Sequence, residues 1–102
     1  MQYVRLRSLR LDRLHVSFHH AILTVVEENG IVVRWVIDIE EAKHHLFDQI
    51  NDRFRFWMEA VDEKGQTFKG SCMIDFVSKK MQVVKLAGVA PLERPSPSFP
   101  ET

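Results

Sequence analysis

Five histidines are the residues whose type best suits metal binding or acid–base chemistry, and four of them form two adjacent pairs. They are His15, His19, His20, His44 and His45. A catalytic zinc ion needs about three convergent protein ligands, and no spacing here resembles the His-Glu-x-x-His pattern of a helical zinc site. Adjacent side chains also diverge, by about 100° in a helix and to opposite faces in a strand. The pattern predicts surface histidines, with His19 facing Glu40 across a hairpin, and no metal site.

Nucleophilic and cofactor chemistry find equally little support. Cys72 alternates with large apolar residues, and a free cysteine in such a setting usually behaves as a small buried hydrophobe. Ser71 and Ser78 lie in no recognisable nucleophile motif, and the chain contains no glycine-rich loop of the kind that holds nucleotide phosphates. We therefore predict no catalytic residue and no cofactor, and an enzyme is only the third hypothesis.

Arginines interleaved with aromatic residues are the strongest candidates for binding. If the segment around Trp57 is a strand, then Arg53, Arg55 and Trp57 share one face. An exposed Trp beside arginines is typical of protein interfaces, and also of small barrels that stack single-stranded bases. In a third interpretation the N-terminal strand or the proline-rich tail covers Trp57. Arg5 and Arg7 add a basic row that suits a phosphate backbone, but a solvated strand face or pairing with the acidic middle segment is favoured. Both arginines are also candidates for an interface.

Length and composition indicate one globular domain of 102 residues, with 45% hydrophobic and 27% charged residues. The 14 basic and 14 acidic side chains balance, so the chain lacks the basic excess of most proteins that bind nucleic acids or anionic membranes. The charges are nevertheless segregated, with arginines in residues 1–20 and acids in residues 21–52. These segments either face each other in the fold or pair between two copies of the chain.

The single cysteine excludes an internal disulfide and favours a reducing compartment. The first residues contain no apolar run like that of a signal peptide, and no stretch approaches the roughly 20 apolar residues that span a bilayer. We expect a cytoplasmic protein with no membrane partner.

Asn29-Gly30 is the clearest structural signal. This dipeptide favours a two-residue type I′ turn, and here it separates two β-rich segments, 21–26 and 31–39. In the second segment every odd-numbered residue is apolar, which indicates a strand with one face on the core. Trp35 lies in the middle of that apolar row, so we expect it to belong to the core.

The turn also predicts a register for this hairpin. A two-residue connection places Val26 opposite Val33 and Thr24 opposite Trp35. A shift by one residue would turn the apolar row outward, which favours this register.

A second hairpin is expected from residues 53–61, a loop at 62–65 and a return strand at 68–76, followed by a last strand at 81–89. The alternation of apolar and polar residues predicts which side chains face the core. They are Phe54, Phe56, Met58, Ala60, Phe68, Gly70, Cys72, Ile74 and Phe76.

The remaining segments carry weaker signals. The pattern over residues 38–51 predicts one short helix, near 40–51, because apolar residues recur every four positions after a possible cap. Residues 4–18 change apolar phase twice, which favours a bulged or broken strand over a helix. All four prolines fall in the tail, 91–102, so it cannot be a central strand.

Together these elements predict a mainly β fold, with an α+β fold as the alternative. The expected domain, 1–90, is a small antiparallel β-barrel or curved sheet of five to six strands with one short helix. The expected function is a non-enzymatic binding or assembly module that self-associates or docks another protein. The alternative is a small barrel that binds single-stranded nucleic acid.

Overall fold

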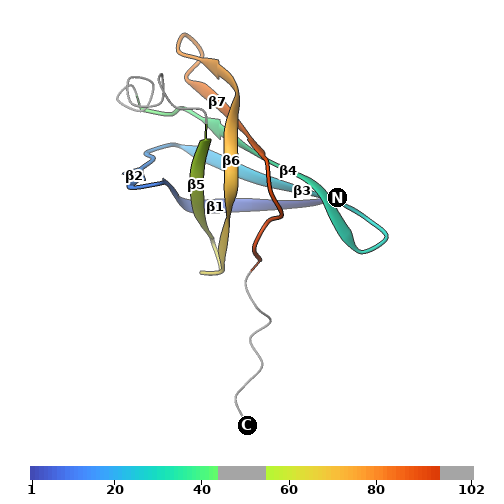
Figure 1. Ribbon diagram of the computed structural model, residues 1–102. Coiled ribbons are helices and arrows are strands. Elements are labelled where there is room, and N and C mark those ends of the chain that lie inside the picture. The colour runs from blue at the N-terminus through green and yellow to red at the C-terminus, as the bar shows by residue number, and fades with distance from the viewer. Residues whose placement is uncertain (44–54, 95–102) are drawn as a thin grey trace.

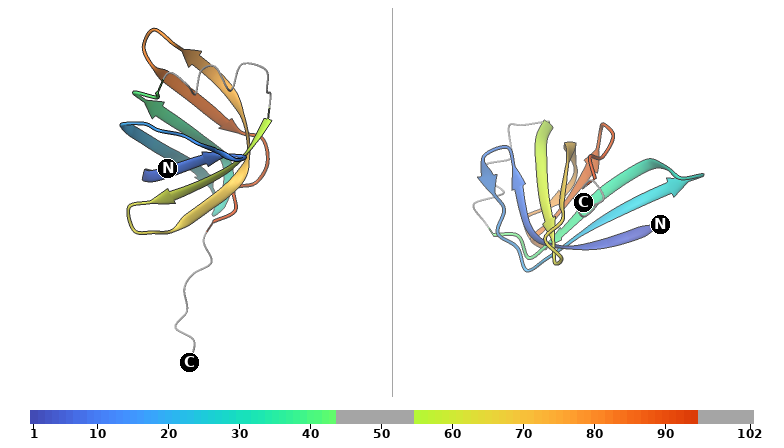
Figure 2. Two further views of the ribbon diagram at one scale, coloured as in Figure 1. Left: turned by 90° about the vertical axis from the view of Figure 1, so that its left-hand side faces the viewer. Right: turned by 90° about the horizontal axis from the view of Figure 1, so that it is seen from below.

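The computed structural model describes residues 1–43 and 55–94, and these residues form a seven-stranded antiparallel sheet (Figure 1). The strands are β1 (Gln2–Leu11), β2 (Leu14–His15), β3 (His20–Glu28), β4 (Ile31–Glu40), β5 (Arg55–Asp62), β6 (Thr67–Ser78) and β7 (Val83–Gly88). Six of them close into a barrel in the order β1-β3-β4-β7-β6-β5, because β5 pairs back with β1 (Figure 2). The short β2 is an additional strand beside β1. The predicted mainly β fold and the small antiparallel barrel are confirmed.

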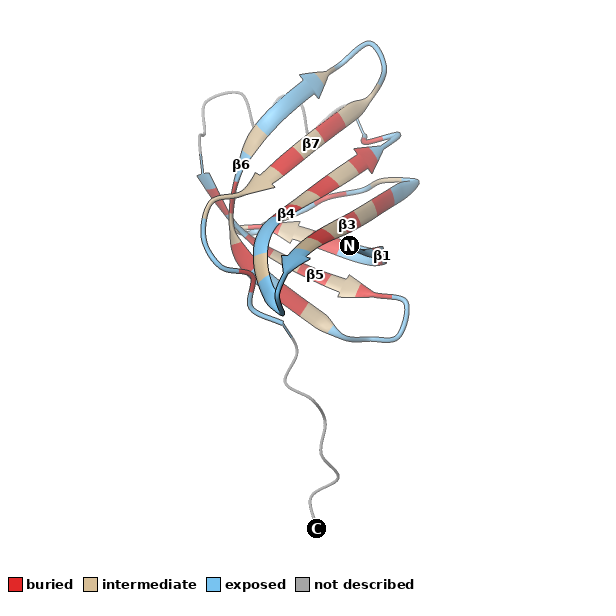
Figure 3. Ribbon diagram, turned by 90° about the vertical axis from the view of Figure 1, so that its right-hand side faces the viewer, coloured by how far each residue is buried: buried red, intermediate tan, exposed pale blue. Residues whose placement is uncertain are grey.

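The interior of the barrel is filled by aliphatic and aromatic side chains. Buried and less buried residues alternate along the strands, as Figure 3 shows for β3 and β4, because successive side chains of a strand point to opposite faces. Leu23, Ile37, Ile39, Met58 and Leu86 are among the largest fully buried side chains. Burial of such side chains is the main favourable contribution to folding.

The first hairpin has the predicted turn, but the predicted register is wrong. Asn29 and Gly30 both have positive φ, 54° and 79°, as a type I′ turn requires. Glu28 then pairs with Ile31, but the register shifts after Glu27, so that Val25, rather than Thr24, lies opposite Trp35. The extra residue in β4 is Val33, which has no partner in the ladder.

The composition of β3 explains this bulge. In the predicted register, Thr24 and His20 would share the inner face with Trp35, and a buried hydroxyl or imidazole without a partner is costly. The bulge instead brings Ala21, Leu23 and Val25 to the inner face, and all three are fully buried. Ile31 and Val33, predicted to face the core, are consequently exposed.

A second bulge allows β1 to change partners. Residues 2–5 of β1 pair with β3, whereas Leu6 and residues 8–11 pair with β5, with a register shift at Arg7. The shift preserves the inward orientation of Leu6 and Leu9 on either side of it, and both are buried. The phase change in the sequence therefore marks a bulged strand, as predicted, and this strand closes the barrel.

The second hairpin largely follows the prediction. Phe56, Met58 and Ala60 are buried, whereas Phe54 lies outside the described residues. The loop turns at Gly65, whose φ is 85°. It is stabilised by the buried Asp62, whose Oδ1 accepts the amide N–H groups of Lys64 at 2.9 Å and Gln66 at 2.8 Å.

The predicted helix also differs from the structure. Asp38, Ile39 and Glu40 belong to β4 rather than to a helix, Glu41 follows with a positive φ of 53°, and the rest of the predicted helix lies outside the described residues. These three residues continue the buried alternation of β4, and their pairing with β7 outweighs local helical propensity. Within the described ranges, no helix has the length and hydropathy needed to cross a membrane.

The indole of Trp35 organises one end of the barrel. Trp35 is buried, as predicted, and its ring lies against two glycines of neighbouring strands, Gly88 of β7 and Gly70 of β6. A Cβ atom on Gly88 would lie 2.1 Å from Cε2 of the ring, and one on Gly70 would lie 2.7 Å from Cζ2. The two inward positions must therefore lack side chains, because the indole occupies their space.

The C-terminal segment that follows β7 is attached to this end of the barrel. Trp35 Nε1–H donates a hydrogen bond to the carbonyl oxygen of Ala90 at 2.8 Å. Lys69 and Glu93 exchange two backbone hydrogen bonds of 2.9 and 2.7 Å, and the side chain of Leu92 is buried. Arg94 forms an ion pair with Glu27. The described part of the predicted tail, residues 91–94, thus packs on the barrel.

We predict that Gly88→Ala lowers the free energy of unfolding by about 1–3 kcal/mol, the usual cost of overpacking. In a Trp35→Phe background the same change should cost less than about 1 kcal/mol, because the smaller ring vacates the space. Urea denaturation of the wild-type protein, the two single variants and the double variant measures the energetic coupling between positions 35 and 88. Ser71→Ala, on the outer face of β6, is the matched control, and equal costs of Gly88→Ala in both backgrounds would contradict the packing argument.

Candidate functional site

Large apolar side chains gather on the outer face of β5 and β6. Trp57, Met73 and Phe76 are 40%, 39% and 51% exposed, and we call these three residues the outer apolar row. Trp57 lies opposite Ser71, two residues before Met73 on β6, and such diagonal neighbours are about 7–8 Å apart. Phe76 follows Met73 on the other side, about 10 Å further along the strand at ~3.3 Å per residue.

Phe76 belongs to this face because of a third bulge. Ile74 pairs with Leu86, but Phe76 pairs with Lys85, so Asp75 is an extra residue in β6. The bulge reverses the alternation, and Phe76, which the sequence pattern predicts on the inner face with Phe68, turns outward. Bulges bend and twist a strand, and the curvature that closes the barrel here also exposes an aromatic ring.

The backbone of Trp57 is fixed by the turn between β1 and β2. Its N–H donates to Asp12 Oδ1 at 3.0 Å, and its carbonyl oxygen accepts the N–H of Asp12 at 2.8 Å. Asp12 has a φ of 55°, which aspartate tolerates better than most residues. The indole is therefore presented from a rigid position, so that binding through it orders little additional chain.

Charged side chains of opposite sign flank the outer apolar row. Arg55 is exposed and lies directly opposite Met73. Asp75 is exposed and follows Met73 by two residues. Neither has an ion pair with another residue in the described part of the chain. Arg10, by contrast, is paired with Glu59.

The structure separates the other predicted binding residues from Trp57. Arg5 lies near the opposite end of β5, where its Nε is 4.0 Å from Glu63 Oε1. Arg7 is the exposed bulge residue of β1. Arg53 lies outside the described residues. Of the predicted set, the structure therefore brings together only Arg55 and Trp57.

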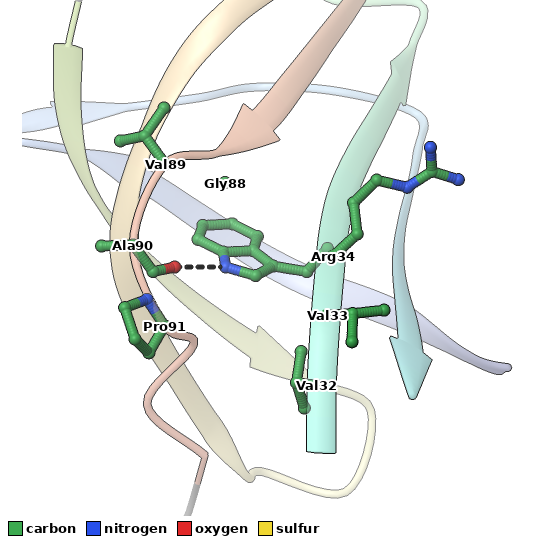
Figure 4. Close-up of a pocket in the computed structure, with 8 residues that line it drawn as sticks. Val32, Val33, Arg34, Gly88, Val89, Ala90 and Pro91 are labelled. Carbon is green, nitrogen blue, oxygen red and sulfur yellow. Dashed lines mark hydrogen bonds between the residues drawn. The ribbon is translucent and has the colours of Figure 1, made fainter. Parts of the chain in front are cut away.

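A cavity of about 330 Å³ opens beside Trp35, between β4 and the C-terminal segment that follows β7 (Figure 4). Its walls are residues 32–35 of β4 and residues 88–91. The indole hydrogen bond to Ala90 crosses it, and the side chain of Arg34 points away from that bond. The lining is mostly backbone and aliphatic groups, which offers no set of converging polar groups for a catalytic reaction.

The histidines in the described ranges form no cluster of ligands. His19 Nδ1 lies 3.9 Å from Glu41 Oε2 rather than facing Glu40, because Glu40 pairs with His20 in the ladder. Among residues 1–43 and 55–94, no three His, Cys, Asp or Glu side chains lie close enough to hold a metal ion. His44 and His45 lie outside these ranges.

Cys72 lies in the core between Phe56 and Gly88 of the flanking strands, and it is fully buried. Burial raises the pKa of its thiol from 9.0 to about 12, and the negative charge of Asp12 adds to the shift. The thiolate, which is the nucleophilic form, is therefore strongly disfavoured at neutral pH.

Sequence patterns alone did not reveal two members of the exposed surface. Met73 was expected on the outer face but not as a binding residue, and Phe76 was expected in the core. The available signal was that four of the five residues from 73 to 77, all but Asp75, are large and apolar, which places such residues on both faces of one strand. Comparisons with protein-family models, with curated proteins and with solved structures found no match to this chain.

We predict that the Cys72 thiol resists modification by a water-soluble disulfide reagent at pH 8 until the protein unfolds. Because its pKa is raised in the folded state, its contribution to stability is complete below pH 9 and is lost as the pH rises toward 12. Over that range the free energy of unfolding should fall by up to about 1.4 kcal/mol per pH unit more than in a Cys72→Ala variant. Equal slopes for the two proteins in denaturation experiments would contradict the buried, neutral thiol.

Proposed function

We propose that this protein is a non-enzymatic binding module that docks protein surfaces through the outer face of β5 and β6. The observation that carries the proposal is the outer apolar row, in which three large apolar side chains on one face of the barrel are 39–51% exposed. Contiguous exposed apolar surface on a small protein typically marks an interaction site. Trp and Arg are also the residues most often found at the energetic centre of protein interfaces.

The distribution of the arginines supports a protein partner over single-stranded nucleic acid. A strand of nucleic acid needs a continuous basic groove with stacked aromatic rings. Here Arg5 and Arg10 are engaged by Glu63 and Glu59, and Arg7 lies at the β1 bulge, several residues from Trp57 along the barrel. Arg55 lies beside the indole, and the acidic residues Asp12 and Asp75 lie close to the same face.

The environment of Cys72 supports the proposal of a cytoplasmic location. The single thiol is free and buried, as is common in reducing compartments.

We predict that a photo-reactive amino acid at position 73 forms cross-links to protein in cells that express the full chain. The same group at position 20, at the start of β3, should form none, because its neighbours His19 and Glu40 are polar. Trp57→Ala should weaken the interaction about thirtyfold, since a hot-spot residue contributes at least about 2 kcal/mol. Cross-linking yield analysed by mass spectrometry measures both effects.

Two outcomes would contradict this function. One is the absence of protein cross-links at position 73, or equal yields at positions 73 and 20. The other is quenching of Trp57 fluorescence by an oligonucleotide at low salt and its loss at high salt, measured in a Trp35→Phe background so that only one indole reports.

A further inference from the structure

The part of β4 that follows its turn has a free edge. β3 pairs with β4 from one end to the other, but the ladder between β4 and β7 covers only residues 36–40 of β4. Within the described part of the chain, residues 31–35 therefore have a neighbouring strand on one side only. A strand edge of this kind presents main-chain hydrogen-bonding groups to an extended chain that lies beside it.

The turn directs the main-chain groups of Val32 to this edge. Glu28 and Ile31 are paired across the two-residue turn, and residues that flank such a turn exchange hydrogen bonds with each other. Successive residues of an antiparallel strand direct their N–H and C=O groups to opposite sides, so those of Val32 point away from β3. Among the described residues neither group has a partner. Val32 thus offers one donor and one acceptor in the arrangement that a neighbouring strand requires.

The cavity beside Trp35 opens along the same edge. Its two walls are residues 32–35 and residues 88–91. Paired strands lie ~4.8 Å apart, whereas here the Trp35 indole and its 2.8 Å hydrogen bond to Ala90 lie between the walls (Figure 4). The walls are therefore further apart than the strands of a ladder, which suits one extended chain. A second copy would bring its own β3 beside its β4, and residues 88–91 lie where that further strand would have to go.

Apolar side chains line both faces of this edge. Val32 packs against the core and lines the cavity, whereas Ile31 and Val33 are 67% and 52% exposed on the outer face. Side chains of paired strands contact each other across the ladder, so an added strand would cover all three. Arg34, the charged residue of the lining, points away from the cavity bond (Figure 4). Uncharged, β-branched residues therefore fit both faces of the added strand.

We propose that this edge binds an extended, uncharged and β-branched segment of a partner protein, which adds to β4 as a strand. One residue of the segment exchanges two main-chain hydrogen bonds with Val32 and directs its side chain into the cavity beside Trp35. Its two neighbours lie beside Ile31 and Val33 on the outer face. In such complexes the main-chain bonds supply affinity, and pockets for alternate side chains supply selectivity. The site is separate from the outer apolar row and is a second docking surface, beyond the proposed function.

A synthetic peptide tests this site in the full chain. The probe is Lys-Thr-Val-Val-Val-Thr-Lys, acetylated and amidated, and the matched control carries N-methyl groups on its three valines. Two-dimensional NMR of nitrogen-labelled protein should show saturable shifts of the Val32 amide and the Trp35 indole N–H. The control should bind at least about tenfold more weakly, because its valines cannot donate a hydrogen bond to the Val32 carbonyl oxygen.

A pair of substitutions locates the bound peptide. Ile31→Ser should weaken binding at least about threefold, because it removes apolar surface that the added strand covers. Met81→Ser is the matched control, since Met81 is also 67% exposed but lies in the turn between β6 and β7. It should leave the dissociation constant unchanged.

Three results would overturn the proposal. They are the absence of shifts at residues 31–35 at millimolar peptide, equal binding of the N-methylated control, and shifts confined to the outer apolar row. Dimerisation of the chain alone that Ile31→Ser abolishes would also overturn it, by identifying a second copy as the occupant of the edge. Cross-links at position 73 in any of these cases would leave the proposed function intact, so the two failures are distinguishable.

Discussion

The packing of the Trp35 indole against Gly88 and Gly70 is the contact on which the rest of this barrel depends. The ring bridges the inner faces of β4, β7 and β6, and it donates a hydrogen bond to Ala90 just beyond β7. A ring in this position requires two inward residues without side chains, and it requires β4 to present Trp35 to the interior. The bulge at Val33 then brings Val25 rather than Thr24 opposite Trp35, so that Ala21, Leu23 and Val25 share the interior with the ring. The ring also determines the route of the C-terminal segment, because Ala90 must lie close enough to accept the hydrogen bond from the Trp35 indole.

The bulges that allow the barrel to close also determine which side chains lie on its surface. The register shifts at Arg7, Val33 and Asp75 each insert one residue into a strand, which increases local twist and permits a short sheet to close. Each insertion also changes which side chains face outward. At Asp75 the result is an exposed Phe76 beside Met73, so the geometry that closes the barrel also creates the apolar part of the binding surface.

The proposed binding surface is rigid because it is built on paired strands rather than on a loop. Trp57 is fixed by two hydrogen bonds to Asp12, and Met73 lies between two ladder partners, Arg55 and Ala87. A surface held in this way pays little conformational entropy on binding. Arg55 and Asp75 lie around its apolar centre, and charges placed in this way affect which partners such a surface accepts.

The sequence by itself determined the local features of this protein. Asn29-Gly30 specified its turn because both positions need positive φ, and strict alternation identified the buried side of β5, since each strand residue faces opposite to the next. The apolar phase change in β1 likewise marked its bulge. Tertiary structure decided the rest. Whether Thr24 is buried or β4 forms a bulge depends on the free energies of two alternative strand pairings, and the exposure of Phe76 depends on the curvature of the closed barrel. A local sequence pattern contains neither. The end of β4 was misjudged as a helix for the same reason, since its pairing with β7 involves residues more than 40 positions away. Of the candidate surface, sequence reasoning identified Trp57 and Arg55, which follow from alternation. It placed Met73 on the outer face without identifying it as a binding residue, and it missed Phe76, whose outward position depends on the bulge at Asp75 and hence on pairing with β7.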